Sequence, residues 1–255
     1  MNFLTVQKDD DKRTFIRWTT NERVQHWVLA VSFVVLVFTG FALKYPDSWW
    51  FRPFSGIGWV FNFRGLIHRI SGAIFIILGF YHLYYMFGTR RGRRLAKAFL
   101  PYMKDLKDFA QNVSYNFGFR KQPPQFDHFS YMEKSEYFAL IWGAVMMGVS
   151  GLLLWFDEIT LSFFPKWTID LVTVIHLYEA WLATLAIVVW HFYYVIFNPE
   201  VYPLNTSMFN GEITEKELRD EYFLEWQGLQ KDADGGQSET EGEKSEKAKV
   251  TEDDY

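Results

Sequence analysis

The chain has 255 residues and no cysteine. This absence excludes disulfides, thiolate metal sites, iron–sulfur clusters and the thioether attachment of c-type haem. Nucleotide-binding and flavin-binding motifs are also missing. A redox metal would therefore have to bind through histidine, of which the chain has six. The net charge of −4 combines a basic middle with an acidic end, and we expect no nucleic-acid partner.

Charged residues are scarce in four long apolar stretches of the sequence. A helix crosses a bilayer with about 20 mostly apolar residues, and each stretch has roughly that length. A soluble four-helix bundle would show polar faces at a helical period, whereas these stretches are apolar on every side apart from a few histidines, Arg69 and Glu179. They predict an all-α integral membrane protein, a bundle of four transmembrane helices. The expected spans are residues 26–43, 66–87, 137–156 and 171–197.

The lysine and arginine residues predict the orientation, because positively charged loops stay in the cytoplasm. Five of them precede the first span and ten lie in the connection at residues 88–136. The other two connections contain three and one. Both chain termini are therefore expected in the cytoplasm. The first 25 residues are charged before any apolar run, which argues against a cleaved signal peptide.

The expected organisation follows from these spans. Residues 95–109 in the cytoplasmic connection alternate apolar and charged side chains, as an interfacial amphipathic helix does. A short helix is expected near residues 214–229, and the acidic end is expected to be disordered because it cannot bury a core. The predicted parts are a cytoplasmic N-terminal segment (1–25), a membrane domain (26–197), a cytoplasmic C-terminal segment (198–231) and an acidic disordered tail (232–255).

Five of the six histidines lie inside or at the ends of the expected spans. Burying an ionisable side chain inside a membrane costs free energy, so such residues usually mark functional sites. A single histidine there is most simply explained by a hydrogen bond to a nearby carbonyl, but five favour a set of metal ligands. Imidazole is a natural iron ligand where no thiolate is available. The five are His26, His68, His82, His176 and His191, while His128 lies in a connection.

The spacing of these histidines places them at two depths. His68 and His82 are 14 residues apart, about 21 Å of helix rise with about 40° of angular drift. His176 and His191 are 15 residues apart, about 22 Å of rise with about 60° of drift. Because the two spans run in opposite directions, His68 meets His176 near the outer side and His82 meets His191 near the inner side. His26 also lies at the inner level, so spacing alone does not choose between His26 and His82.

Each depth can hold one iron between two imidazoles, as a bis-histidine haem requires. Small residues follow the same helix faces, with Gly72 and Gly79 in the second span and Ala180 and Ala183 in the fourth. They leave space for a porphyrin. A small-residue seam for helix contact explains them equally well.

Four parts of the sequence form recognisable motifs, namely Glu22–Trp27 running to Thr39-Gly40, Gly65–His68, Val174–His176 and Trp190–Tyr193. These motifs resemble the cytochrome b subunits of formate dehydrogenase and nickel–iron hydrogenase. The resemblance covers the four spans, roughly residues 14–197.

The resemblance implies a set of haem ligands. His68 and His176 would hold an outer haem, and His26 and His191 would hold an inner haem. The chain departs from that family at His82, which has no usual counterpart there. The separation of 15 residues in the fourth span is also one residue longer than is typical of the family.

The resemblance also implies a function, electron transfer across the bacterial cytoplasmic membrane between a quinone pool and a partner redox subunit. The implied cofactors are two non-covalent b-type haems, with quinone or menaquinone as the exchangeable substrate. The partner would carry iron–sulfur clusters or a multihaem cytochrome c on the outer face. The family's quinone pocket, near the inner haem, corresponds to residues 131–136.

Two other functions stay open from the residues alone. One is a self-contained transmembrane b-type reductase for an outside acceptor. The other is a haem or metal transport protein that uses histidines transiently, although matched spacing in two spans favours permanent ligation.

Charged residues near the ligands allow competing roles. Glu179 either relays protons for an outer quinone site or pairs with Arg69. Arg23 and Arg69 are candidates for binding haem propionates, or are interfacial residues that extend their charge to water.

Overall fold

The computed structural model describes residues 6–9, 12–55, 57–199 and 201–232. The chain divides into two compact units. Unit 1 combines the described parts of residues 1–17, 98–134 and 212–255, and unit 2 combines residues 18–97 and 135–211. The histidines of the expected spans all belong to unit 2.

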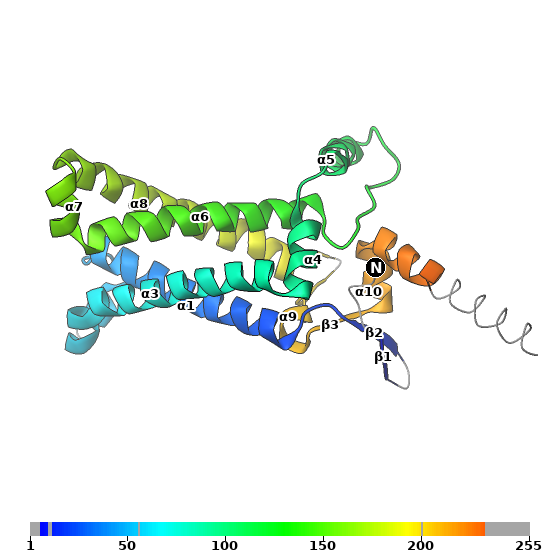
Figure 1. The fold of residues 1–255 in the computed structure, drawn as a ribbon, viewed down its shortest axis with the longest axis horizontal. Coiled ribbons are helices and arrows are strands. Elements are labelled where there is room, and N and C mark those ends of the chain that lie inside the picture. The colour runs from blue at the N-terminus through cyan, green and yellow to red at the C-terminus, as the bar shows by residue number, and fades with distance from the viewer. Residues whose placement is uncertain (1–5, 10–11, 56, 200, 233–255) are drawn as a thin grey trace, which may run out of the picture. The chain divides into compact units, whose positions relative to one another are not determined.

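Four long helices make up most of unit 2 and run side by side (Figure 1). Each is long and apolar enough to cross a membrane. In the most apolar window of each helix, at most 17% of the residues are buried. Large apolar side chains therefore face outward over the whole bundle, as in a protein surrounded by lipid. The helices are α1 (Thr20–Lys44), α3 (Gly58–Gly88), α6 (Tyr131–Trp155) and α8 (Trp167–Leu185), and α8 continues through the π-helical segments η1 (Ala186–His191) and η2 (Tyr193–Phe197).

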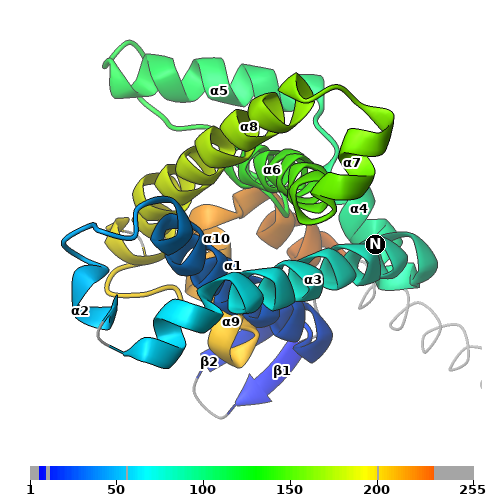
Figure 2. The same cartoon turned by 90° about the vertical axis from the view of Figure 1, so that its left-hand side faces the viewer.

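The long helices associate in two pairs. Seen along the bundle, α1 lies beside α3 and α6 lies beside α8 (Figure 2). Four short helices accompany them, with α7 at one end of the bundle and α4 and α9 at the other (Figure 1). These short helices are α2 (Arg52–Ser55), α4 (Arg90–Phe99), α7 (Asp157–Phe163) and α9 (Ser207–Asn210).

The helices begin earlier than their apolar stretches. Thr19 caps α1, because its side chain accepts from the backbone N–H of Glu22 while the Glu22 carboxylate accepts from the backbone N–H of Thr19. This reciprocal capping starts the helix six residues before the predicted span. Pro46 follows the other end of α1, where a helix cannot readily continue. The apolar runs of the sequence thus indicate which part of a helix lies in lipid, and the capping residues indicate where the helix begins.

The connection between the second and third spans differs from the prediction. One amphipathic helix was expected over residues 95–109, but α4 ends at Phe99 and a separate helix, α5, spans Met103–Asn116. Pro101 lies between them. Proline lacks the backbone N–H of a helix interior and disfavours helical geometry in the residue before it, which explains the break.

Unit 1 contains a small antiparallel sheet that the sequence patterns did not predict. Its strand order is β1 (Val6–Asp9), β2 (Lys12–Ile16) and β3 (Glu212–Thr214), so segments almost 200 residues apart share one sheet. Phe15 pairs with Ile213 across β2 and β3. Both are buried with Leu218 and Tyr222 in the core of this unit.

The helical stretch expected near residues 214–229 is present in two parts. Helix α10 spans Glu215–Glu221, and residues 223–232 are also helical. Thr214 and Glu217 cap α10 reciprocally, as Thr19 and Glu22 cap α1. The predicted acidic tail, residues 232–255, lies outside the described residues except for Asp232.

Candidate functional site: two histidine pairs in the helix bundle

The first pair of histidines lies toward the α7 end of the bundle. His68 of α3 faces His176 of α8, with 6.3 Å between the ring centroids and 74° between the ring planes. A hydroxyl group binds the Nδ1 atom of each ring. Thr39 Oγ1 lies 3.0 Å from Nδ1 of His68, and Ser150 Oγ lies 2.8 Å from Nδ1 of His176.

These hydroxyl groups determine which ring nitrogen carries the proton. The single hydroxyl proton of Thr39 is donated to the helix carbonyl of Val35, and that of Ser150 is donated to the carbonyl of Met146. Each oxygen must therefore accept a hydrogen bond from Nδ1–H of its histidine. Nε2 of both rings is left with a lone pair, which is the form that binds a metal.

A glycine follows each of these hydroxyl residues and allows the histidine to approach. A Cβ atom on Gly40 would lie 3.1 Å from Cε1 of His68, and a Cβ atom on Gly151 would lie 3.3 Å from Cε1 of His176. Thr39-Gly40 belongs to α1 and Ser150-Gly151 to α6. The two helix pairs therefore share one arrangement. In each, a hydroxyl residue followed by glycine (a hydroxyl–glycine dipeptide) on the first helix contacts a histidine of the second helix.

The second pair lies at the opposite end of the bundle. His26 of α1 faces His191 at the end of η1, with 6.4 Å between the ring centroids and 41° between the planes. Nδ1 of His191 lies 3.6 Å from Oε2 of Glu136. Nδ1 of His26 is buried without a hydrogen-bond partner among the described residues.

His82 is held away from this pair by two hydrogen bonds. Its Nδ1 lies 2.8 Å from Oε1 of Gln25, and its Nε2 lies 2.9 Å from the hydroxyl of Tyr137. Because the amide oxygen of Gln25 can only accept, His82 donates from Nδ1 and accepts from Tyr137 at Nε2. Both ring nitrogens are therefore occupied, and the structure brings His26, not His82, against His191.

The long spacing in the fourth span has a structural counterpart. The last six residues before and including His191 form the π-helical segment η1. A π-helix closes its hydrogen bonds one residue further along the chain than an α-helix does, so a π turn contains an additional residue. A π-helical segment of this kind can accommodate such a residue, and η1 ends at His191, which faces His26.

Comparison with known proteins identifies the family. A family model described as "Prokaryotic cytochrome b561" matches residues 17–211. This chain belongs to the prokaryotic cytochrome b561 family. It is a membrane b-type cytochrome of electron transfer in the bacterial inner membrane, and the predicted all-α fold with four membrane-spanning helices is confirmed.

Curated relatives of this cytochrome are subunits of formate dehydrogenase. The cytochrome b556(fdo) subunit of formate dehydrogenase from Escherichia coli is 23% identical over 208 residues, which cover 79% of this chain and 86% of the relative. The cytochrome b556 subunit from Haemophilus influenzae is 25% identical over 155 residues, 59% of this chain. The match spans 58% of the length of the Haemophilus subunit.

The geometry of both histidine pairs fits a haem iron in this cytochrome. Two imidazoles on one metal are separated by two metal–nitrogen bonds of about 2 Å each and by the two ring radii, roughly 6 Å between centroids. The observed 6.3 and 6.4 Å match that separation. The hydroxyl groups of Thr39 and Ser150 would act as the outer partners that orient metal-bound histidines.

Replacing Ser150 with alanine should weaken the binding of a haem at His176 and change its midpoint potential. Loss of the acceptor at Nδ1 makes the His176 imidazole less basic, so we expect haem affinity to fall about tenfold and the midpoint potential to rise. Haem titration and potentiometry measure both. Ser32→Ala is the matched control, because Ser32 is also buried but bonds only to the carbonyls of Val28 and Leu29. Equal effects of the two substitutions would contradict the role of Ser150.

The charged residues near the ligands contact other groups of the protein. The guanidinium of Arg69 lies over the ring of Trp155, 5.9 Å from its centroid. Among the described residues, no ion pair joins Arg69 to Glu179. The Glu179 carboxylate instead lies against Gly143 of α6. Arg23 donates to the backbone carbonyl of Phe209.

Residues 131–136 were expected to form a quinone pocket. Two charged side chains of this segment, Glu133 and Lys134, bind residues of unit 1 instead. Glu133 accepts from Ser130 and Tyr222 in unit 1. Lys134 binds both carboxylate oxygens of Asp105 at 2.9 Å. Within the predicted segment, Glu136 reaches His191, and the adjacent Tyr137 reaches His82. Sequence reasoning missed Tyr137 and Gln25 because their roles depend on contacts between helices.

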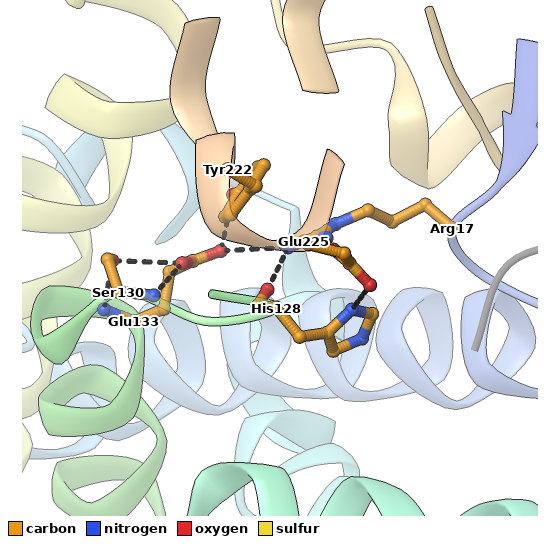
Figure 3. A network of polar contacts seen from close by, with 6 residues as sticks. All are labelled: Arg17, His128, Ser130, Glu133, Tyr222 and Glu225. Atoms are coloured by element: carbon orange, nitrogen blue, oxygen red, sulfur yellow. Dashed lines mark hydrogen bonds and ion pairs between the residues drawn. The ribbon is translucent and has the colours of Figure 1, made fainter. Parts of the chain in front are cut away.

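Glu133 belongs to a buried polar network in unit 1, which Figure 3 shows. Arg17 donates to the backbone carbonyl of His128 at 2.6 Å and lies 3.4 Å from Glu225 and 3.6 Å from Glu133. His128 Nδ1 lies 2.6 Å from the Glu225 carboxylate. Burial raises the pKa of Tyr222, whose hydroxyl donates to Glu133. The network explains the one histidine outside the spans, which connects parts of unit 1.

Unit 1 should lose stability as the pH falls below about 6.5, the ordinary pKa of histidine. Burial lowers the pKa of His128, the Arg17 guanidinium lowers it further, and the bond to Glu225 opposes but does not reverse the shift. The unfolded chain therefore binds a proton at a higher pH than the folded chain, so acid favours unfolding. The loss of stability begins near the pKa of His128 in the unfolded chain. It is complete at pH values below the pKa of His128 in the folded chain.

Backbone hydrogen exchange, corrected for intrinsic rates, measures this effect in residues 126–130. Protection should fall between about pH 7.5 and pH 5.5 in the natural chain. His128→Gln is the control, since glutamine does not titrate. If that variant showed the same loss of protection, a different group would be responsible.

Proposed function

We propose that this cytochrome is the membrane-anchoring di-haem subunit of a respiratory oxidoreductase. His68 and His176 would ligate the iron of an outer haem, and His26 and His191 that of an inner haem. The observation that carries the proposal is the presence of two facing imidazole pairs, one toward each end of the bundle, at the separation one metal needs. A b-type haem supplies one-electron chemistry between ferric and ferrous iron.

The two haem levels would together form a path for electrons across the membrane. On α1, His26 belongs to the inner pair and Thr39 supports the outer pair. Their separation of 13 residues corresponds to about 20 Å of helix rise. The distribution of lysine and arginine supports an orientation with both chain termini in the cytoplasm.

A quinone site beside the inner haem is the second part of the proposal. Polar groups suited to a quinone gather at this level, namely His82 with Tyr137 and Glu136 with His191. These groups, rather than Glu133 and Lys134, would line the quinone site, because Glu133 and Lys134 bind Tyr222 and Asp105 in unit 1. Quinone or menaquinone would exchange protons with the cytoplasm there.

The redox partner would bind at the outer side, near His68 and His176. The names of the relatives, which are formate dehydrogenase subunits, support a partner subunit. Because this chain has no cysteine, iron–sulfur clusters or covalent c-type haems would have to be carried by that partner. Iron–sulfur clusters or a multihaem cytochrome c would pass electrons to or from the outer haem.

Haem quantitation on the purified full chain tests this proposal. A dithionite-reduced minus oxidised spectrum should show b-type bands, and extraction should give two haems per chain. Adding a quinol to the oxidised protein should then reduce both haems. One haem per chain would contradict the two-level path, and two haems that quinol does not reduce would contradict the quinone site.

A further inference from the structure

Helix α5 exposes an apolar stripe along its outer face. Met103, Leu106 and Phe109 are 71%, 62% and 51% exposed, and Val113 is also exposed. Spacings of three and four residues place these side chains on one side of the helix. Phe117 follows directly after the helix and is more exposed than any of them. The stripe is thus a continuous apolar surface within unit 1.

The opposite face of α5 is polar and is turned toward the protein. Lys104 donates to Asp108 at 2.5 Å and to the carbonyl of Gln125 at 2.8 Å. Asp105 binds Lys134 through both carboxylate oxygens. The side-chain amides of two further residues make similar contacts. Gln111 donates to the carbonyl of Pro123, and Asn112 donates to the hydroxyl of Tyr131. All these contacts hold α5 to the segment that follows it.

This arrangement is the reverse of that in a helix on the surface of a soluble domain, which buries its apolar face and exposes its polar face. The polar contacts fix the rotation of α5 about its axis, so the helix cannot turn its apolar side inward without breaking them. An apolar environment must therefore cover the side chains of Met103, Leu106, Phe109 and Val113. Lipid and another protein surface both meet that requirement.

Two features favour lipid. The chain connects α5 closely to a membrane helix, because α3 ends at Gly88, α4 follows from Arg90, and only residues 100–102 separate α4 from α5. Exposed cations also flank the apolar stripe, with Lys107 on α5 and Arg120 and Lys121 just after it. Cations beside an apolar helix face suit anionic phospholipid headgroups.

We propose that α5 is an in-plane membrane anchor. Its apolar stripe inserts into the lipid leaflet at the Gly88 end of α3, while Lys107, Arg120 and Lys121 contact anionic headgroups. The polar face of α5 then holds residues 122–134 at the membrane surface. This anchoring is independent of haem and quinone binding.

The absence of cysteine in the chain makes single-site labelling a direct test. Leu106→Cys and Val113→Cys are labelled with a nitroxide in the full chain, reconstituted in vesicles of phosphatidylethanolamine and phosphatidylglycerol. Lys216→Cys on α10 is the matched control, because Lys216 is exposed on a polar helix of the same unit. An unchanged b-type spectrum verifies that each labelled protein is folded.

Collision of the label with oxygen, which concentrates in lipid, is compared with collision with a water-soluble nickel chelate. The ratio of oxygen to nickel accessibility should be at least about fivefold higher at residues 106 and 113 than at residue 216. A ratio equal to the control would place α5 in water and overturn the proposal. Protection from both reagents would show a covering protein surface, and spin–spin broadening would show a second copy of the chain. Either of these results would also overturn it.

Discussion

With the proposed haem ligands, His26→Ala is expected to leave the cytochrome with one haem per chain instead of two. His26 faces His191 at 6.4 Å between ring centroids, and no other imidazole of the described residues is oriented to replace it. A bis-histidine iron that loses one ligand loses most of its hold on the protein. The outer pair, His68 and His176, is untouched, so half of the b-type absorbance should remain. Haem extraction and the reduced minus oxidised spectrum measure both quantities.

His82→Ala is the matched control for that substitution. His82 lies at the same level of the bundle, but Gln25 and Tyr137 occupy its two ring nitrogens. We expect this variant to retain two haems and to be slower in quinol-dependent haem reduction, because the proposed quinone site loses a polar group. If His82→Ala lost the inner haem and His26→Ala kept it, the assignment of the inner ligands would be reversed.

The two levels of histidines could be predicted from the sequence because helix geometry alone determines them. A separation of 14 or 15 residues places two side chains about 21 to 22 Å apart along a helix, which fixes their two depths. The choice between His26 and His82 could not be made in this way. It depends on Gln25 and Tyr137, which lie on other helices and reach His82 only in the folded bundle.

The groups that support the ligands were only partly visible in the sequence. Thr39-Gly40 belongs to a motif that suggested the family, but its contact with His68 was not predicted. Ser150-Gly151 repeats the same pair of residue types in the third span and serves His176. A search for hydroxyl–glycine dipeptides shared by the two helix pairs would have found both. The sheet formed by β1, β2 and β3 left no comparable signal, because β3 has only three residues and pairs with a strand almost 200 positions earlier.

The π-helical segment η1 explains why an additional residue in the fourth span is compatible with the site. In an uninterrupted α-helix, one inserted residue rotates everything beyond it by about 100°. Such a rotation would turn His191 away from His26. The wider π turn holds the additional residue locally, so the residues beyond it keep their direction. Helix winding, rather than spacing alone, therefore aligns the inner pair.

Deleting Val188, an exposed residue of η1, should therefore preserve both haems. The deletion removes the additional residue, so the segment can become regular α-helix while His191 keeps its direction. Inserting an alanine after Val188 should instead cost one haem, because a second additional residue would turn His191 by about 100° and move it about 1.5 Å along the axis. Haem quantitation on the two variants compares them directly. Loss of a haem from the deletion variant, with two haems kept by the insertion variant, would show that the winding of η1 does not align His191.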